Sequence, residues 1–295
     1  MRRREVIVSV FGSVLAWSSI ARADQPARMR QIAYLGTPSA SEQAARVEAL
    51  REGLRQLGYM EGTNLTILFR WGEGRYERLP DLAAELVQLK PDVILTHGTP
   101  GTRAAMAATT TVPIVAIVVG DLLSPGLVTS LARPGGNLTG QTFFFPEICA
   151  KRPELMKEAV PAVTRVAIVV NPDNQSYPMA WAAVERTAQV LGVDLLALEA
   201  RTREELVSGF ATLTTAGVHA AVIVDDPFLI ANAALIAELG LSGRVPIIGE
   251  KGHTSAGAFM SYGVDLSDFW FRSATLVDRE RNRPTFRSSK RPDLN

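Results

Sequence analysis

An apolar, β-branched run between Pro113 and Gly120 constrains the fold more than any other stretch of this 295-residue chain. The run, Ile114 to Val119, contains no polar side chain, which is typical of a strand buried on both faces of a parallel sheet. Gly120 and Asp121 follow at its carboxyl end, where open α/β sheets hold their ligands. The sequence therefore predicts an α/β protein with a binding site near the end of this strand.

The residues after this run predict a bridge between two lobes. We expect a short helix from Gly126 to Ala132, ended by Pro134-Gly135-Gly136, and then an extended segment from Asn137 to Phe145. Strands alternate with helices on both sides of the bridge, which is typical of parallel βαβ units with right-handed crossovers. The chain should thus form two Rossmann-like lobes with parallel sheets that share a cleft.

Periodicity and turn residues place the expected elements of each lobe. In the first lobe the predicted strands are 32–35, 64–71, 92–96 and 114–119, and the predicted helices follow Ser39 or Ser41, cover 76–89 and end at Ala108. In the second lobe the predicted strands are 165–170, 193–198, 218–224 and 245–248, and the predicted helices are 153–160, 178–191, 202–213 and 228–239. An extended segment at 256–262 should return the chain to the first lobe, where 266–277 is helical. The predicted boundaries are 24–140 with 266–278 for the first lobe and 141–265 for the second.

The amino terminus resembles an export leader. Arg2-Arg3-Arg4 is a basic start, Val6 to Ile20 is a short apolar stretch, and Ala21-Arg22-Ala23 fits the small-x-small cleavage pattern. The apolar stretch is shorter than the ~20 residues that a membrane-spanning helix needs. The paired arginines suit either a Sec or a twin-arginine leader. We expect residues 1–23 to be a signal peptide and the mature protein to be periplasmic, the alternatives being an uncleaved anchor or a cytosolic protein.

Composition and motifs exclude several classes of function. The net charge is +1 and no basic face is indicated, so we expect no nucleic-acid partner. The single cysteine, Cys149, excludes an intramolecular disulfide and a CxxC metal site. The chain lacks GxSxG, HExxH, a Walker loop and a GxGxxG that follows a strand. These patterns indicate no catalytic motif, cofactor or metal, and we expect a monomer.

A long ordered string in the bridge carries a resemblance to a known family. Asp121, Gly126 to Val128, Ser130 to Asn137 and Thr139-Gly140 resemble the signature of the ABC transporter substrate-binding proteins, which include TrpX-like amino-acid binders. The resemblance extends from the leader to about Asp278. It implies a type I periplasmic-binding fold, no catalysis, and capture of a small solute for an ABC permease.

The first group of candidate ligand-binding residues follows the predicted strand at 92–96. Gly98, Thr99 and Thr102 begin a helix, where free N–H groups and hydroxyls suit a carboxylate, although these residues would also cap a helix without a ligand. His97 could hydrogen-bond or stack on a solute, or be a satisfied loop histidine. His253 is expected in a solvated loop.

Carboxylates and amides after other strands form the second group. Asp121, Asp225 and Asp226 could each pair with a buried ammonium group, although turn and capping roles are equally open to them, above all to Asp226. Asn171 and Asn174 can donate and accept hydrogen bonds.

The remaining candidates lie at the edges of the proposed cleft. Gly36 and Thr37 should face the two asparagines across it, and Tyr262 could line an apolar pocket or pack at the hinge. Phe143 to Phe145 are expected to be core and hinge packing.

The final segment, 279–295, is basic and aperiodic, which predicts a solvated tail. It differs from the resembled family, whose members continue with another strand and helix. The leading hypothesis is an exported solute-binding protein for an amino acid or similar solute, possibly an aromatic one. The alternatives are a ligand-sensing domain of a regulator and an α/β enzyme; a two-cysteine racemase is disfavoured by the single cysteine.

Overall fold

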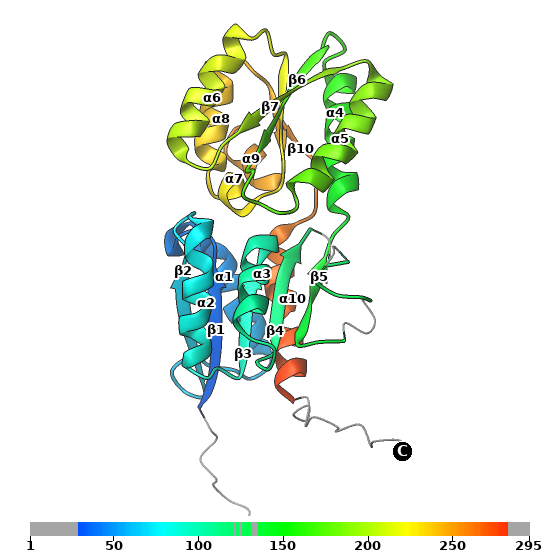
Figure 1. Ribbon diagram of the computed structural model, residues 1–295. Helices are drawn as coiled ribbons and strands as arrows, with labels where there is room; N and C mark the ends of the chain where they lie inside the picture. Colours follow the sequence, from blue (N-terminus) through cyan, green and yellow to red (C-terminus); the bar gives the residue numbers. More distant parts are fainter. Residues whose placement is uncertain (1–28, 121, 124–125, 131–134, 283–295) are drawn as a thin grey trace, which may run out of the picture.

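The computed structural model describes residues 29–120, 122–123, 126–130 and 135–282, which form two lobes, one above the other in Figure 1. The predicted leader, Asp121 and residues 283–295 lie outside the described residues. Two crossings join the lobes, one between β5 and α4 and the other leading into α10 (Figure 1).

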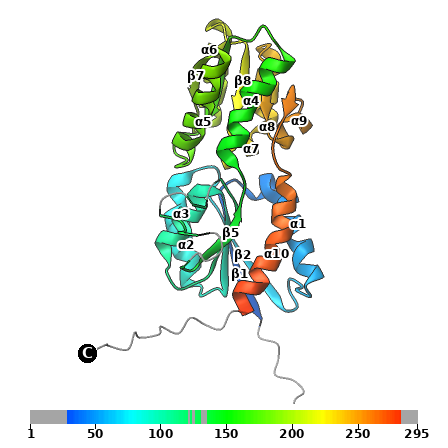
Figure 2. The same ribbon diagram turned by 90° about the vertical axis from the view of Figure 1, so that its right-hand side faces the viewer.

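The sheet of the first lobe has five parallel strands among the described residues, in the order β2-β1-β3-β4-β5. The strands are β1 (Arg30–Gly36), β2 (Leu65–Trp71), β3 (Val93–His97), β4 (Ile114–Val119) and β5 (Leu138–Thr142). The helices are α1 (Ala40–Gln56), the short η1 (Tyr76–Arg78), α2 (Leu79–Gln88), α3 (Gly98–Ala108) and α10 (Leu266–Asn282). Figure 2 shows α1 beside α10 on one face of this lobe, with α2 and α3 on the other.

The sheet of the second lobe also has five parallel strands in the described part of the chain, in the order β10-β9-β8-β6-β7. The strands are β6 (Arg165–Val170), β7 (Asp194–Glu199), β8 (Ala220–Ile223), β9 (Ile247–Gly249) and β10 (Met260–Ser261). The helices are α4 (Phe145–Ala159), α5 (Tyr177–Leu191), α6 (Arg203–Thr215), α7 (Pro227–Ala231), α8 (Ala233–Ser242) and α9 (Lys251–Ser255). The predicted α/β class with two parallel sheets is confirmed.

Alternate residues of each strand enter different cores, as the two-residue period of a strand requires. Tyr34 and Leu95 pack toward α1 and α10, whereas their neighbours Leu35 and Ile94 pack toward α2 and α3. The central strands β1, β3, β4, β6 and β8 are largely buried on both faces, which explains their continuous apolar runs.

Three predicted helices are wrong in extent. Residues 126–130, the described part of the helix expected from Gly126, form turns and bends, and Gly126 has a left-handed φ of 85° that does not begin a helix. Helix α4 starts at Phe145, with Pro146 in the first turn where a missing N–H is harmless, and Pro153 lies inside it. The helix predicted at 228–239 is divided into α7 and α8 at Asn232.

Helix α10 also continues past its predicted end, through Asn282. It therefore includes the first residues of the segment expected to be a tail.

The strand order brings the carboxyl ends of both sheets toward the cleft. The chain leaves β1 for β2 on one side and returns to β3 on the other, and it does the same around β6, β7 and β8. A crevice forms where the direction of winding reverses, outside the carboxyl ends of the strands. The residues that follow β3, β6 and β8 therefore meet between the lobes.

Candidate functional site

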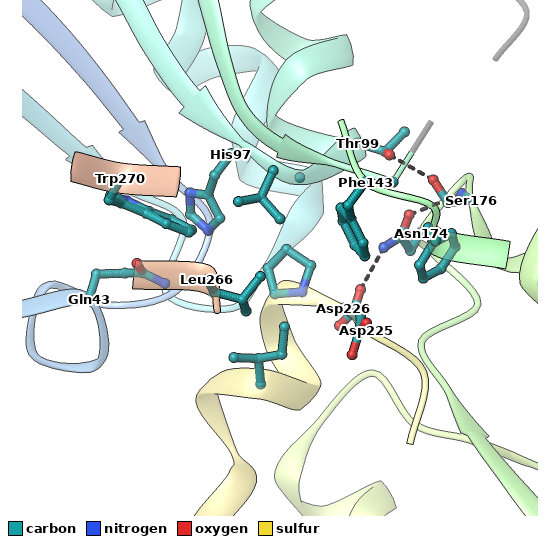
Figure 3. A pocket seen from close by; sticks show the side chains of 16 residues that line it. Gln43, His97, Thr99, Phe143, Asn174, Ser176, Asp225, Asp226, Leu266 and Trp270 are labelled. Atoms are coloured by element: carbon teal, nitrogen blue, oxygen red, sulfur yellow. Dashed lines mark hydrogen bonds between the residues drawn. The ribbon is translucent and has the colours of Figure 1, made fainter. Parts of the chain in front are cut away.

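A cavity between the lobes lies at this meeting point (Figure 3). Its polar lining consists of Gln43, His97, Thr99, Asn174, Ser176, Asp225 and Asp226, and its apolar lining includes Val118, Phe143, Phe145, Pro227, Ile230, Leu266 and Trp270. The cavity volume is about 40 Å³, whereas one buried water needs about 10–15 Å³. The lobes are thus closed on each other, and a solute of amino-acid size requires them to separate.

The end of β3 supplies the wall of the first lobe. Gly98 has a φ of 69°, and a Cβ there would lie 2.8 Å from Pro227 of the other lobe, so glycine permits both the turn and the close approach. Thr99 lies in the first turn of α3, whose first N–H groups lack partners within the helix and are not capped by a side chain.

His97 is buried and belongs to a chain of hydrogen bonds behind this wall. Trp270 Nε1 donates to the Tyr34 hydroxyl at 3.1 Å, and that hydroxyl lies 3.4 Å from His97 Nδ1. Burial, with the nearby Arg46 charge as a smaller cause, lowers the pKa of His97 to about 3. His97 is therefore neutral at physiological pH.

Several buried polar atoms of the first lobe have no hydrogen-bond partner among the described residues. Two of them, Gln43 Oε1 on α1 and His97 Nε2, belong to side chains that line the cavity, and Thr37 Oγ1 lies at the start of the loop after β1. Buried polar side-chain atoms are normally paired, so each such atom needs an explanation.

Asp226 dominates the wall of the second lobe, and its carboxylate is fully occupied. Oδ2 accepts from the Tyr76 hydroxyl at 2.7 Å and from Asn174 Nδ2 at 2.8 Å. Oδ1 accepts from the backbone N–H groups of Phe228 and Leu229, which caps α7. Burial is the largest influence on this carboxyl and raises its pKa, although the donors around it act in the opposite direction.

Asp225 is held by a buried arginine. Arg152 Nη2 lies 2.8 and 3.0 Å from the two carboxylate oxygens of Asp225, and the Arg152 side chain is fully buried. The guanidinium also donates to the carbonyl oxygens of Ile223 and Tyr262. Burial raises the pKa of Asp225, and the Arg152 charge opposes that rise.

Direct hydrogen bonds cross the cleft, among them one from the Phe228 N–H of the second lobe to the Tyr76 hydroxyl of the first at 3.3 Å. Tyr76 of the first lobe donates to Asp226 of the second, and the hydroxyls of Thr99 and Ser176 lie 2.6 Å apart. These bonds hold the lobes together in the closed arrangement.

The apolar lining contains a strained residue. Val118 has a φ of 52°, which is rare for a β-branched residue, and the pairing of β4 with β5 shifts register at this point. Strain of this kind costs about 1–3 kcal/mol and persists where surrounding structure fixes it, often at binding sites.

The structure brings five of the ten predicted ligand-binding residues to the cavity, namely His97, Gly98, Thr99, Asn174 and Asp225. Gly36, Thr37, Asn171 and Tyr262 do not line it, and Asp121 lies outside the described residues. Tyr262 is 41% exposed and contributes its carbonyl to Arg152 instead. The prediction that His253 lies in a solvated loop is wrong. His253 is fully buried on α9, with Nδ1 3.5 Å from Glu250 Oε1.

Other lining residues had no signal in the sequence. Gln43, Leu266 and Trp270 come from helices α1 and α10, where each fits an ordinary helical pattern. Ser176, two residues after Asn174, could have been found from its place after β6.

Two searches restricted to the described residues bear on other functions. No group of three or more His, Cys, Asp and Glu side chains there could hold a metal ion. None of the helices described is both long and apolar enough to cross a membrane.

Sequence comparisons place the chain among binding proteins. The profile of the family described as ABC transporter substrate binding protein matches residues 34–279. A curated relative, the tyrosine-binding protein of Clostridioides difficile (strain R20291), is 24% identical over 227 residues, which are 77% of this chain and only 65% of that protein.

Solved structures share the fold. A conserved domain protein from Vibrio cholerae matches with a TM-score of 0.80 and 24% identity, over 88% of this chain and 86% of that one. An ABC domain from Streptococcus pneumonia in complex with L-Trp matches with a TM-score of 0.78 and 19% identity, over 87% and 86%. With the family profile covering most of its length, the chain belongs to the ABC transporter substrate-binding proteins.

Proposed function

We propose that this protein captures an amino acid with an apolar or aromatic side chain between its lobes and delivers it to an ABC permease. The observation that carries the proposal is the interlobe cavity, in which Gln43 Oε1 and His97 Nε2 lack partners among the described residues. A solute that enters the cavity can supply those partners.

The hydrogen bonds that cross the cleft suggest how the ends of the solute bind. When the lobes separate, Tyr76 leaves Asp226 and Thr99 leaves Ser176. An ammonium group can then donate to Asp226, because a buried carboxylate needs a donor. A carboxylate can accept from Thr99 and from the N–H groups that start α3. The apolar lining suits a side chain between them.

The names of two relatives support an aromatic amino acid. One relative is a tyrosine-binding protein, and a solved neighbour holds L-Trp. We further propose that residues 1–23 direct export, and that the mature protein works in the periplasm as a monomer that binds without catalysis.

Calorimetry and thermal unfolding of the purified protein test this function with L-tyrosine, L-tryptophan, L-phenylalanine, L-leucine and D-glucose. We expect an aromatic L-amino acid to bind, and at ~100 times its Kd to stabilise the protein by about 2.7 kcal/mol. Asp226→Asn should weaken that binding, because it removes the charge that faces the ammonium. Asp173→Asn, which changes an exposed carboxylate in the loop after β6, is the matched control. Stabilisation by the sugar and by none of the amino acids would contradict the proposal.

A further inference from the structure

We propose that the Gln43–His97 end of the cavity binds a hydroxyl group on the solute's side chain, and so selects a phenol or alcohol over the hydrocarbon of the same shape. The inference rests on the proposed function for the placement of the solute's ammonium and carboxylate. Its own support is the hydrogen-bonding state of two buried atoms.

The first atom is His97 Nε2, which we assign as a donor from the hydrogen bonds that Tyr34 makes with Trp270 and His97. The Trp270 indole can only donate, so the Tyr34 oxygen accepts from it at 3.1 Å. We assign the Tyr34 proton to the contact with His97 Nδ1 at 3.4 Å, so that Nδ1 is the acceptor. A neutral imidazole with Nδ1 accepting carries its proton on Nε2. That Nε2–H is buried and has no partner among the described residues, on a side chain that lines the cavity.

The second atom is an acceptor. Gln43 Oε1 is buried in the same lining and likewise has no hydrogen-bond partner in the described part of the chain. A hydroxyl group accepts one hydrogen bond and donates another. It is therefore the smallest single group that satisfies His97 Nε2–H and Gln43 Oε1 together.

His97 and Gln43, the two polar groups at this end, are both uncharged. His97 is uncharged because burial lowers its pKa to about 3. Arg46 lies over the Trp270 ring at 5.4 Å, and its charge interacts favourably with that of Glu250. A carboxylate would accept from His97 but would have no proton for Gln43 Oε1, and its burial would add a desolvation cost.

The two polar ends of the cavity lie apart. In Figure 3, Gln43 and His97 gather beside Trp270 and Leu266, whereas Thr99, Ser176, Asn174 and Asp226 gather on the opposite side, with Phe143 between. A solute with charged groups at one end, an apolar middle and a hydroxyl at the other fits this arrangement.

Matched ligand pairs test the inference by calorimetry. We expect the protein to bind L-tyrosine about tenfold or more tighter than L-phenylalanine, because phenylalanine leaves both atoms unpaired. Gln43→Leu should reduce that preference below about threefold, chiefly by weakening tyrosine. Gln56→Leu, an exposed change on the same helix, should leave it unchanged. Tyr34→Phe, which removes the hydroxyl that orients His97, is a second variant and should also lower the preference.

The outcomes separate this inference from the proposed function. Equal affinities for L-tyrosine and L-phenylalanine would overturn the inference and leave amino-acid capture standing. Binding of p-cresol over toluene that depends on Gln43, without binding of any amino acid, would uphold the inference and contradict the proposed function. Tighter binding of 4-carboxy-L-phenylalanine than of L-tyrosine, or no binding of either hydroxylated compound, would also overturn it.

Discussion

The two walls of the cleft satisfy their polar groups in opposite ways. On the second lobe, Asp226 accepts four hydrogen bonds and Asp225 is paired with Arg152. On the first lobe, Gln43 Oε1 and His97 Nε2 line the same cavity without partners among the described residues. The two aspartates of the second wall have their partners before a solute binds, whereas these two atoms of the first wall do not.

This difference suggests that charged groups and neutral groups of the cleft depend on a solute to different degrees. Charges on the second lobe must be paired within the protein, because an uncompensated buried charge costs several kcal/mol. Neutral groups on the first lobe can wait for a solute at a smaller cost, about 1–3 kcal/mol for each unsatisfied group. Loss of a partner should therefore affect folding more on the second lobe than on the first.

The largest expected effect follows removal of the buried cation of the second lobe. Arg152→Met leaves Asp225 buried without its counter-charge and should lower the free energy of unfolding by about 3–5 kcal/mol. Urea denaturation measures this change in the free energy of unfolding. The double variant Arg152→Met with Asp225→Asn should recover much of the loss, because the stranded charge is gone.

Gln43→Leu is the counterpart on the first lobe. It removes an acceptor that has no partner, so it should change stability by less than about 1 kcal/mol. A loss as large as that of Arg152→Met would break the contrast between the walls.

The second prediction concerns the bond that joins the walls. Tyr76→Phe removes the 2.7 Å hydrogen bond to Asp226, and hydrogen bonds to charged groups contribute about 1.5–3 kcal/mol. Because this bond links the two lobes, its loss should favour the open arrangement and increase the radius of gyration of the solute-free protein in X-ray scattering. Tyr177→Phe, which packs on Trp181 within the second lobe, is the control. Unchanged scattering from Tyr76→Phe would mean that the bond does not hold the lobes closed.

The sequence was sufficient for the architecture, because apolar strands and helical periodicity are local signals. Ser39 does cap α1, in a capping box with Glu42, and Gly192 does end α5 in the left-handed conformation. Errors arose where local signals compete. Pro153 indicated a helix start, but the burial of Cys149 and Met156 extends α4 on both sides of it.

The site was predictable only where it follows strand ends. His97, Gly98, Asn174 and Asp225 all come after strands, and the general rule for open sheets locates them. Gln43 and Trp270 lie on helix faces that pack together from distant parts of the chain, and no local pattern marks them as lining a cavity. Their hydrogen-bonding state depends on tertiary contacts that a linear sequence does not display.

The pH dependence of stability tests whether the wall of the first lobe is neutral. The pKa of His97 is about 3 in the folded protein, against about 6.5 in an unfolded chain. Above pH 6.5 neither state is protonated at this residue, and the full stability is present. As the pH falls below 6.5 the unfolded chain takes up a proton that the folded protein excludes, so stability declines toward pH 3. Between pH 8 and 5 this should remove about 2 kcal/mol.

His97→Phe isolates that contribution, because phenylalanine keeps an aromatic ring against Trp270 and does not titrate. Urea denaturation at pH 8 fixes the difference between the two proteins where the histidine is neutral in both states. At pH 5 that difference should have moved by about 2 kcal/mol in favour of the variant. Parallel pH profiles would mean that the folded protein admits a charge at His97. The first wall could then carry a charge, as the second wall does. His97 Nε2–H would no longer be the neutral donor on which hydroxyl selection depends.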